Sequence, residues 1–187
     1  MKIVGLELMP GNERSVAVCF LTETLDDVIK LDGDEELIKK VEAFRPDIVA
    51  IGSPLSLPEK GNIRKAEQEL SKRNLKFRYP IGLLAVEQVV MRGIGLKNHF
   101  QSKGFLVIET FPNGFYELIR IPKKDNYADV KRFLKIYKIN LERRNYTQEE
   151  LNSIISAFTG RLFLDAKVEF LGDENEGQIV LPRVINY

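Results

Sequence analysis

Residues 47–58 read DIVAIGSPLSLP. This stretch predicts a buried strand of a sheet and, directly after it, a loop that carries functional residues. The apolar run 48–51 is mostly β-branched, with a proline before it and Gly52 and two prolines after it. That is the pattern of a buried strand that opens into a stiff loop. Ser53 precedes a proline, which biases its backbone toward an extended conformation. Ligands of open α/β sheets bind at the carboxyl ends of strands, so we expect functional residues here.

Strand patterns flank this stretch on both sides. Residues 2–8, 15–21 and 24–31 predict three antiparallel strands, with a turn at 10–12 between the first two. Residues 105–110 predict another buried strand that runs into a proline, and 178–181 predict a last short strand. We therefore expect an α/β fold with a mixed five-stranded sheet, in which three antiparallel strands are followed by parallel ones.

Most of the remaining chain has the apolar spacing of amphipathic helices. The spacing of apolar residues predicts a helix that stops before Pro46, and further helices at 62–74, 83–100 and 127–139. Thr147 and Glu150 form a capping box that predicts the start of a last helix. These helices are expected to flank the sheet.

Length and composition restrict the class of protein. The 187 residues suit a single domain over 1–187, and the net charge of +1 provides no global attraction to nucleic acid or membrane. One cysteine, Cys19, and one histidine, His99, exclude a metal cluster of the Cys or His type. No apolar run is long enough for a membrane span, so we expect a soluble, cytoplasmic protein.

Positive charge is concentrated in residues 120–144, which hold nine basic and three acidic residues. The segment could follow a nucleic-acid backbone, with Lys123 and Lys124 as substrate-binding residues. The alternative is a solvated helical face. Residues 145–187 carry seven acids and three bases, consistent with a solvated or acidic rim.

Two glutamates occupy positions where a charge is costly. Glu7 and Glu109 lie at or near the ends of apolar strands, where a carboxylate needs a partner. If the two strands are neighbours, the carboxylates could converge and bind Mg²⁺ or Mn²⁺. The alternatives are pairing with Arg or Lys, or exposure to water.

Two residues in or near the loop at 52–58, which we call the proline loop, are candidate substrate ligands. Arg64 could bind a phosphate or substrate, or could form an ordinary i,i+3 surface pair with Glu67. Ser53 is a second candidate substrate-binding residue. A Ser-His hydrolase is disfavoured, because no G-x-S-x-G motif surrounds Ser53.

The order of these segments resembles a family of uncharacterised proteins, catalogued as a domain of unknown function and predicted to be RNase H-like nucleases. Gly5-Leu6-Glu7 resembles the G-I-D of its first strand, and AIGSPLSLP at 50–58 resembles its A-I-D-A-P-L-S-L-P, followed by an arginine at Arg64. Residues 108–112, 150–154 and 172–182 resemble its E-x-x-P, E-L-D-A and G-D…E-G-x-I-V-x-P motifs. The resemblance therefore extends over most of the chain.

The resemblance implies a metal site built from four acidic positions. Glu109 matches outright, Glu7 stands where the family has Asp, and Gly52 and Asn152 stand where it has two further Asp residues. It thus implies Glu7, Glu109 and Asn152 as catalytic residues, with Glu7 and Glu109 as ligands of Mg²⁺ or Mn²⁺. Two functions follow: a metal-dependent nuclease or phosphodiesterase with a degenerate site, or a non-catalytic module that binds nucleic acid or protein.

Overall fold

The computed structural model describes residues 1–9, 15–75, 84–122 and 126–183. Its elements follow the chain in this order: β1 (Ile3–Leu8), β2 (Ser15–Leu21), β3 (Leu25–Asp32), α1 (Asp34–Phe44), β4 (Ile48–Ile51), α2 (Lys65–Lys72), α3 (Leu84–Ser102), β5 (Leu106–Thr110), α4 (Pro112–Leu118), α5 (Tyr127–Ile136), α6 (Gln148–Leu164), β6 (Val168–Asp173) and β7 (Gly177–Pro182).

The strands form one mixed sheet in the order β3-β2-β1-β4-β5-β7-β6. β1, β2 and β3 pair antiparallel, whereas β4 is parallel to β1 and β5 is parallel to β4. The predicted α/β class and the pairing of the first strands are confirmed, but the predicted count of five strands is wrong. The described sheet has seven, because β7 continues it beyond β5 and β6 pairs antiparallel with β7 as a hairpin.

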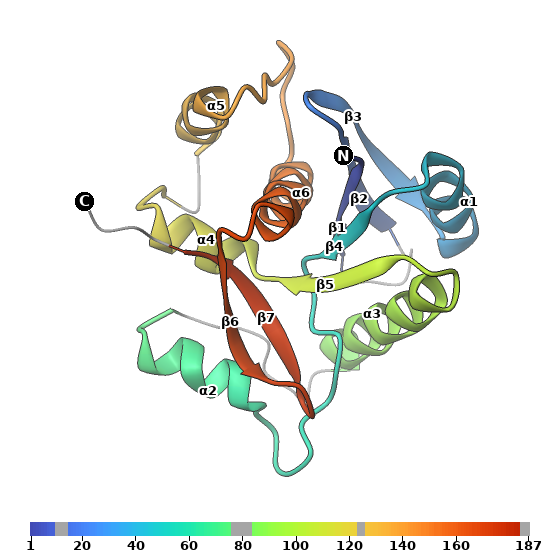
Figure 1. Cartoon of the computed structure of the whole chain (residues 1–187), viewed down its shortest axis with the longest axis vertical. Coiled ribbons are helices and arrows are strands. Elements are labelled where there is room, and N and C mark those ends of the chain that lie inside the picture. Colours follow the sequence, from blue (N-terminus) through green and yellow to red (C-terminus); the bar gives the residue numbers. More distant parts are fainter. Residues whose placement is uncertain (10–14, 76–83, 123–125, 184–187) are drawn as a thin grey trace.

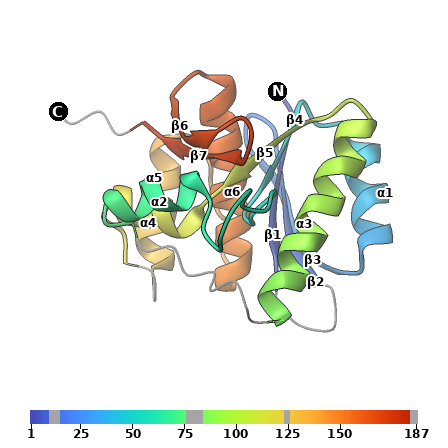
Figure 2. The same ribbon diagram turned by 90° about the horizontal axis from the view of Figure 1, so that it is seen from below.

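Helices cover both faces of the sheet. α1 and α3 lie on one face, where Leu37 and Leu96 pack against strand residues such as Ile51. α6 lies on the other face of the sheet (Figures 1 and 2), and α5 packs outside it through Val130 and Leu134. α2 covers the β6–β7 hairpin. No helix in the described ranges is long and apolar enough to span a membrane.

Helix and sheet approach each other very closely at Gly5 of β1. A Cβ atom added at Gly5 would lie 2.1 Å from the carbonyl oxygen of Ser153 and 2.4 Å from the amide nitrogen of Ala157. The α6 backbone therefore rests directly on β1, which only glycine permits. This contact fixes Asn152, in the first half of α6, beside the carboxyl end of β1.

We predict that Gly5→Ala lowers the free energy of unfolding by about 3 kcal/mol, because the methyl group meets backbone atoms that cannot move aside. Gly95→Ala is the matched control, since a Cβ atom at Gly95 has no neighbour within 4 Å. It should raise stability by about 0.5–1 kcal/mol through helix propensity alone. Urea unfolding measures both, and equal values for the two variants would contradict the close packing of α6 on β1.

Candidate functional site at the carboxyl ends of the central strands

Glu7 stands near the carboxyl end of β1, facing the first half of α6. Its Oε1 accepts a hydrogen bond of 3.0 Å from Nδ2 of Asn152. Its Oε2 is buried and has no hydrogen-bond partner in the part of the chain that the structure describes. The carboxyl group is thus half satisfied, which is unfavourable for a charged carboxylate.

The Glu7 carboxyl occupies the space that a side chain at position 52 would fill. A Cβ atom added at Gly52 would lie 2.2 Å from Oε2 of Glu7 and 3.1 Å from Oγ of Ser156. In this enclosed position burial raises the pKa of Glu7 to about 8, although the Asn152 hydrogen bond opposes the shift. Glu7 is therefore mainly a neutral carboxylic acid at pH 7.

Asn152 is held in one orientation by two further side chains. Its Oδ1 accepts hydrogen bonds from Nε2 of Gln148 at 2.9 Å and from the hydroxyl of Tyr116 at 3.1 Å. Its amide nitrogen, rather than its oxygen, consequently faces Glu7. Neither partner was predicted from the sequence. The i,i+4 spacing of Gln148 and Asn152 was a usable signal, whereas Tyr116 arrives from α4 and had none.

Glu109, at the carboxyl end of β5, is held by Arg64. Both terminal guanidinium nitrogens of Arg64 donate to it, Nη1 to Oε2 at 2.8 Å and Nη2 to Oε1 at 2.6 Å. The backbone N–H of Leu55 donates to Oε2 as well, at 2.8 Å. Arg64 is only 1% exposed, so this bidentate pair is shielded from water.

The Arg64 guanidinium also contacts α2 and the proline loop. Nε of Arg64 donates to Oε1 of Glu67 at 2.9 Å, and Nη1 donates to Oγ of Ser56 at 2.7 Å. Burial by itself would lower the pKa of Arg64, but the hydrogen bonds and charges of Glu109 and Glu67 raise it above its ordinary value. The predicted i,i+3 pair of Arg64 and Glu67 does form, but it is buried instead of lying on a helix surface.

The β6–β7 turn closes over the same loop. Glu176 accepts backbone N–H bonds from Lys65 at 2.8 Å and from Glu59 at 3.0 Å, and Ser56 donates to its carbonyl oxygen. The proline loop is therefore held by hydrogen bonds from two residues: the buried Arg64 and Glu176 of the β6–β7 turn.

Strand register places Glu7 and Glu109 on opposite faces of the sheet. Leu6, Ile51 and Glu109 are in register across β1, β4 and β5. Leu6 and Ile51 pack on the α1–α3 side, so Glu109 points to that side as well. Glu7 is the next residue along β1 and points to the α6 side, where it meets Asn152. The convergence of the two carboxylates that we expected does not occur.

These residues do not fit a divalent metal ion held by Glu7 and Glu109. Both oxygens of Glu109 are bonded to Arg64, and the oxygen of Asn152 is bonded to Gln148 and Tyr116. Among the described residues, no group of three or more His, Cys, Asp or Glu side chains is placed to hold a metal. Mg²⁺ and Mn²⁺ require several free oxygen ligands, which this arrangement does not offer.

The other predicted substrate ligands lie elsewhere. Ser53 is 2% exposed and lies beneath α3, where a Cβ atom at Gly93 would be 3.3 Å from its Oγ. Its hydroxyl has no hydrogen-bond partner among the described atoms. Lys123 and Lys124 lie outside the described residues.

Comparison with solved structures identifies proteins whose fold is similar to that of this chain. The chain is similar to RuvC of Thermus thermophilus in complex with a Holliday junction substrate, with a TM-score of 0.57 and 14% identity. A second structure of T. thermophilus RuvC matches with a TM-score of 0.51 and 12% identity. Each match covers 89% of this chain and 96% of the RuvC chain. The RNase H-like class predicted from the sequence is confirmed. No family model and no curated protein matches the chain.

We predict that Arg64→Met lowers the free energy of unfolding by about 3–5 kcal/mol at neutral pH, because it leaves two buried carboxylates without their cation. Burial already raises the pKa of Glu109, with Arg64 opposing, so the deficit should shrink as the pH falls and the carboxylates take up protons. Arg73→Met is the control. It removes the exposed pair with Glu169 and should cost at most about 1 kcal/mol. Equal losses in the two variants would show that the Arg64 cluster adds nothing special to stability.

A second prediction concerns the proton on Glu7. Its pKa is about 8 in the folded protein against 4.5 ordinarily, so unfolding releases a proton between these values and wild-type stability falls as the pH rises through this window. Glu7→Gln cannot titrate. Its unfolding free energy relative to wild type should therefore rise by about 2–4 kcal/mol between the two pKa values, at up to about 1.4 kcal/mol per pH unit.

Urea unfolding over this pH range provides the measurement. Glu36→Gln, at an exposed glutamate of α1, reports the general effect of removing one carboxylate. If the curves of Glu7→Gln and wild type stay parallel, Glu7 is charged at neutral pH and the neutral-acid assignment fails.

Proposed function

We propose that this protein binds nucleic acid through the outward face of α5, and that this binding does not depend on a divalent metal ion. The observation that carries the proposal is an exposed basic surface on α5 and the turn after it, formed by Arg132, Lys135 and Lys138. We call these three residues the α5 basic face. Asp129 is the acid that the structure places near it, 3.8 Å from Arg132.

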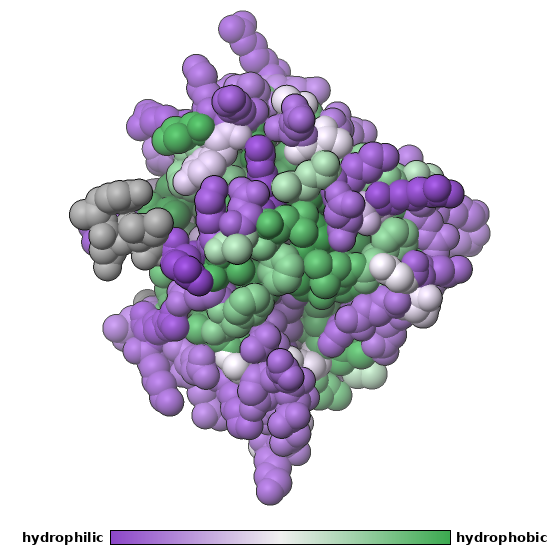
Figure 3. All heavy atoms as spheres, in the orientation of Figure 1, coloured by the Kyte–Doolittle hydropathy of each residue, from purple (hydrophilic) through white to green (hydrophobic). Residues whose placement is uncertain are grey.

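A row of cations and aromatic rings adjoins the α5 basic face. Nζ of Lys131 lies 5.5 Å from the ring centre of Tyr127, which stacks on Tyr146 at 5.9 Å. The guanidinium of Arg144 lies 3.9 Å from the ring centre of Tyr146. Basic side chains with interleaved aromatic rings suit a phosphate backbone and its bases. In the view of Figure 3, mostly hydrophilic side chains cover this part of the surface.

Two further points support nucleic acid as the ligand. The RuvC structure to which the fold is similar is described in complex with a Holliday junction substrate. In addition, the two glutamates at the carboxyl ends of the strands add little negative charge, because Glu7 is held neutral and Glu109 is paired with Arg64.

The second candidate function is a nuclease or phosphodiesterase that depends on Mg²⁺ or Mn²⁺. The observation that favours it is the unpartnered Oε2 of Glu7, which leaves one buried oxygen free for a cation among the described residues. This candidate ranks second because Glu109 lies on the other face of the sheet and is bonded to Arg64.

We predict that replacing the three residues of the α5 basic face by Glu weakens binding to duplex DNA and to a four-way junction. The slope of log K against log salt should fall by about 0.9 for each phosphate that the variant no longer neutralises. The control variant carries Lys30→Glu, Lys60→Glu and Lys72→Glu, three exposed lysines on other elements, and has the same net charge. Fluorescence anisotropy across a salt series measures both variants.

Three outcomes separate the candidates. Binding that survives EDTA, is abolished in the α5 variant and is retained in the control supports the proposal. Equal weakening in both variants would reduce the effect to net charge and overturn the role of α5. Cleavage that requires Mn²⁺ and disappears in Glu7→Gln would instead establish the second candidate.

A further inference from the structure

Four aromatic side chains lie together where α4, α5 and α6 meet (Figure 1). Phe115 of α4, Phe133 of α5 and Phe158 of α6 pack edge to face, with ring centres 5.6–5.8 Å apart. Tyr137, the residue after the end of α5, adds a fourth ring at 4.7 Å from Phe158 and 5.1 Å from Phe133. Rings that contact one another in this way are already positioned before a ligand binds.

These rings line a cavity of about 350 Å³ that opens at the surface. Phe115 and Phe158 are each 1% exposed and form its base, whereas Tyr137 is 41% exposed and lies at its mouth. Two exposed cations, Lys167 and Arg183, also line the cavity, and none of the lining residues is acidic. An apolar base with a few polar groups is typical of a site for a small aromatic group.

The positive charge at the mouth is only partly compensated. Nζ of Lys167 lies 3.4 Å from Oδ2 of Asp165, so this cation has an acidic neighbour. Nη2 of Arg183 donates to the carbonyl oxygen of Val168 at 3.1 Å, and no acid of the described ranges lies within ion-pair distance of it. Arg183 can therefore donate further hydrogen bonds to an anion.

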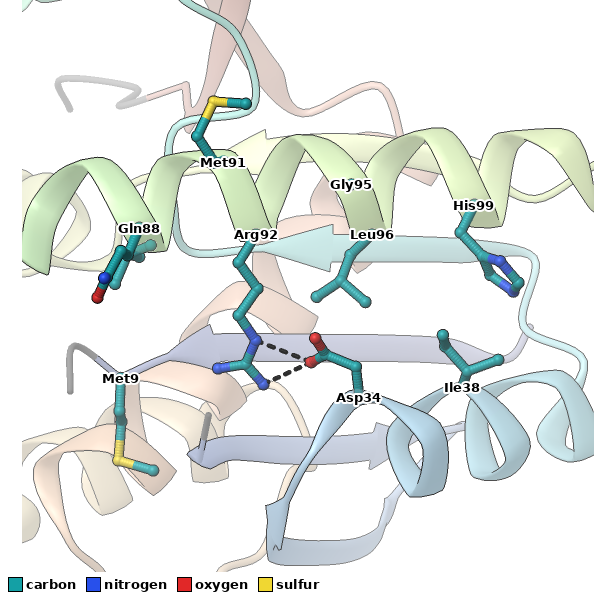
Figure 4. A pocket seen from close by; sticks show the side chains of 10 residues that line it. Met9, Asp34, Ile38, Gln88, Met91, Arg92, Gly95, Leu96 and His99 are labelled. Carbon is teal, nitrogen blue, oxygen red and sulfur yellow. Dashed lines mark hydrogen bonds and ion pairs between the residues drawn. The ribbon is translucent and has the colours of Figure 1, made fainter. Parts of the chain in front are cut away.

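A larger groove, between α1 and α3, lacks this combination of rings and free charge. It measures about 630 Å³, and no phenylalanine or tyrosine is among the described residues that line it. Figure 4 shows Arg92 reaching across it from α3 to Asp34, with Nη2 2.7 Å from Oδ1. That cation is already paired, so the groove is a poorer site for an aromatic anion.

We propose that the cavity at α4, α5 and α6 receives one unpaired base of a bound nucleic acid, which stacks on Tyr137 while its phosphate contacts Arg183. Every base has an aromatic face, so such stacking tolerates any sequence. A paired base must first leave its duplex to enter a cavity. The inference rests on the proposed function and names its substrate class, a nucleic acid with an unpaired nucleotide.

The position of the cavity beside the α5 basic face favours this occupant over an apolar segment of a protein. Lys138 of that face is the next residue after Tyr137, and Arg161 donates to the carbonyl oxygen of Tyr137 at 3.4 Å. A strand whose phosphates contact the α5 basic face therefore lies within reach of the mouth. An apolar protein segment would use the rings but would leave the charge of Arg183 without a partner.

A single-stranded oligothymidine with one central 2-aminopurine tests the site, because stacking on an aromatic ring quenches 2-aminopurine fluorescence. The wild type should quench it on binding. Tyr137→Leu should remove most of the quenching and lower the affinity ratio of single strand to duplex about tenfold. Tyr137→Phe restores the ring and should restore both. Phe170→Leu makes the same change at a 49% exposed ring outside the cavity and is the matched control.

A second variant keeps the aromatic cluster intact. Arg183→Glu should weaken single-strand binding more than Lys30→Glu, which changes the charge equally at an exposed position on β3. Equal weakening by the two variants would overturn the phosphate contact at the cavity. Circular dichroism verifies that each variant is folded.

The outcomes separate this inference from the proposed function. Salt-dependent binding of both ligands without quenching in the wild type would overturn the cavity as a base site and leave the proposed function intact. Quenching that persists in Tyr137→Leu and is lost in Tyr146→Leu would place the base on the stacked pair of Tyr127 and Tyr146, which also overturns the inference. A wild type that binds neither ligand would overturn the proposed function and this inference together.

Discussion

A guanidinium group that is 1% exposed must find an acceptor for its N–H groups inside the protein, and this requirement at Arg64 organises the carboxyl end of the sheet. The acceptors come from three parts of the chain: Glu109 of β5, Glu67 of α2 and Ser56 of the proline loop. Each acceptor is itself positioned by the same cation. The path of the loop, the start of α2 and the end of β5 are therefore one cooperative unit, in which a buried charge enforces geometry as well as contributing energy.

Glu7 and Glu109 are both buried carboxyl groups, but their surroundings differ. Burial raises the pKa of Glu109, but the pairing with Arg64 opposes this rise, whereas Glu7 has no cation among the described residues and holds a proton instead. Their separation follows from the alternation of side chains along a strand. Once Leu6 and Glu109 are in register through Ile51, Glu7 must point to the other face. A shift of one residue in register would have placed both carboxylates on one side.

The sequence was sufficient for the features that depend on local physics. The strand at 48–51, the stiff loop after it and the capping box of Thr147 and Glu150 are observed as predicted, because apolar runs, prolines and caps act over a few residues. The β6–β7 hairpin was only half predicted, since β6 ends in a glycine and an acidic residue, a pattern that favours a loop. The relative faces of Glu7 and Glu109 could not be predicted, because they depend on the offset between separate strands, which no local pattern specifies.

The burial of Glu67 escaped prediction for a related reason. An Arg and a Glu three residues apart usually lie on a helix surface, and the acceptor that draws Arg64 inward, Glu109, is 45 residues away. The contact between Glu7 and Gly52 could not be predicted either, because it joins two segments that are distant in the sequence. Their sequence positions are distant, yet Oε2 of Glu7 fills the volume where a side chain at 52 would begin. Glu7 on β1 and Gly52 directly after β4 are therefore one structural feature, because any side chain at position 52 would clash with the carboxyl group of Glu7.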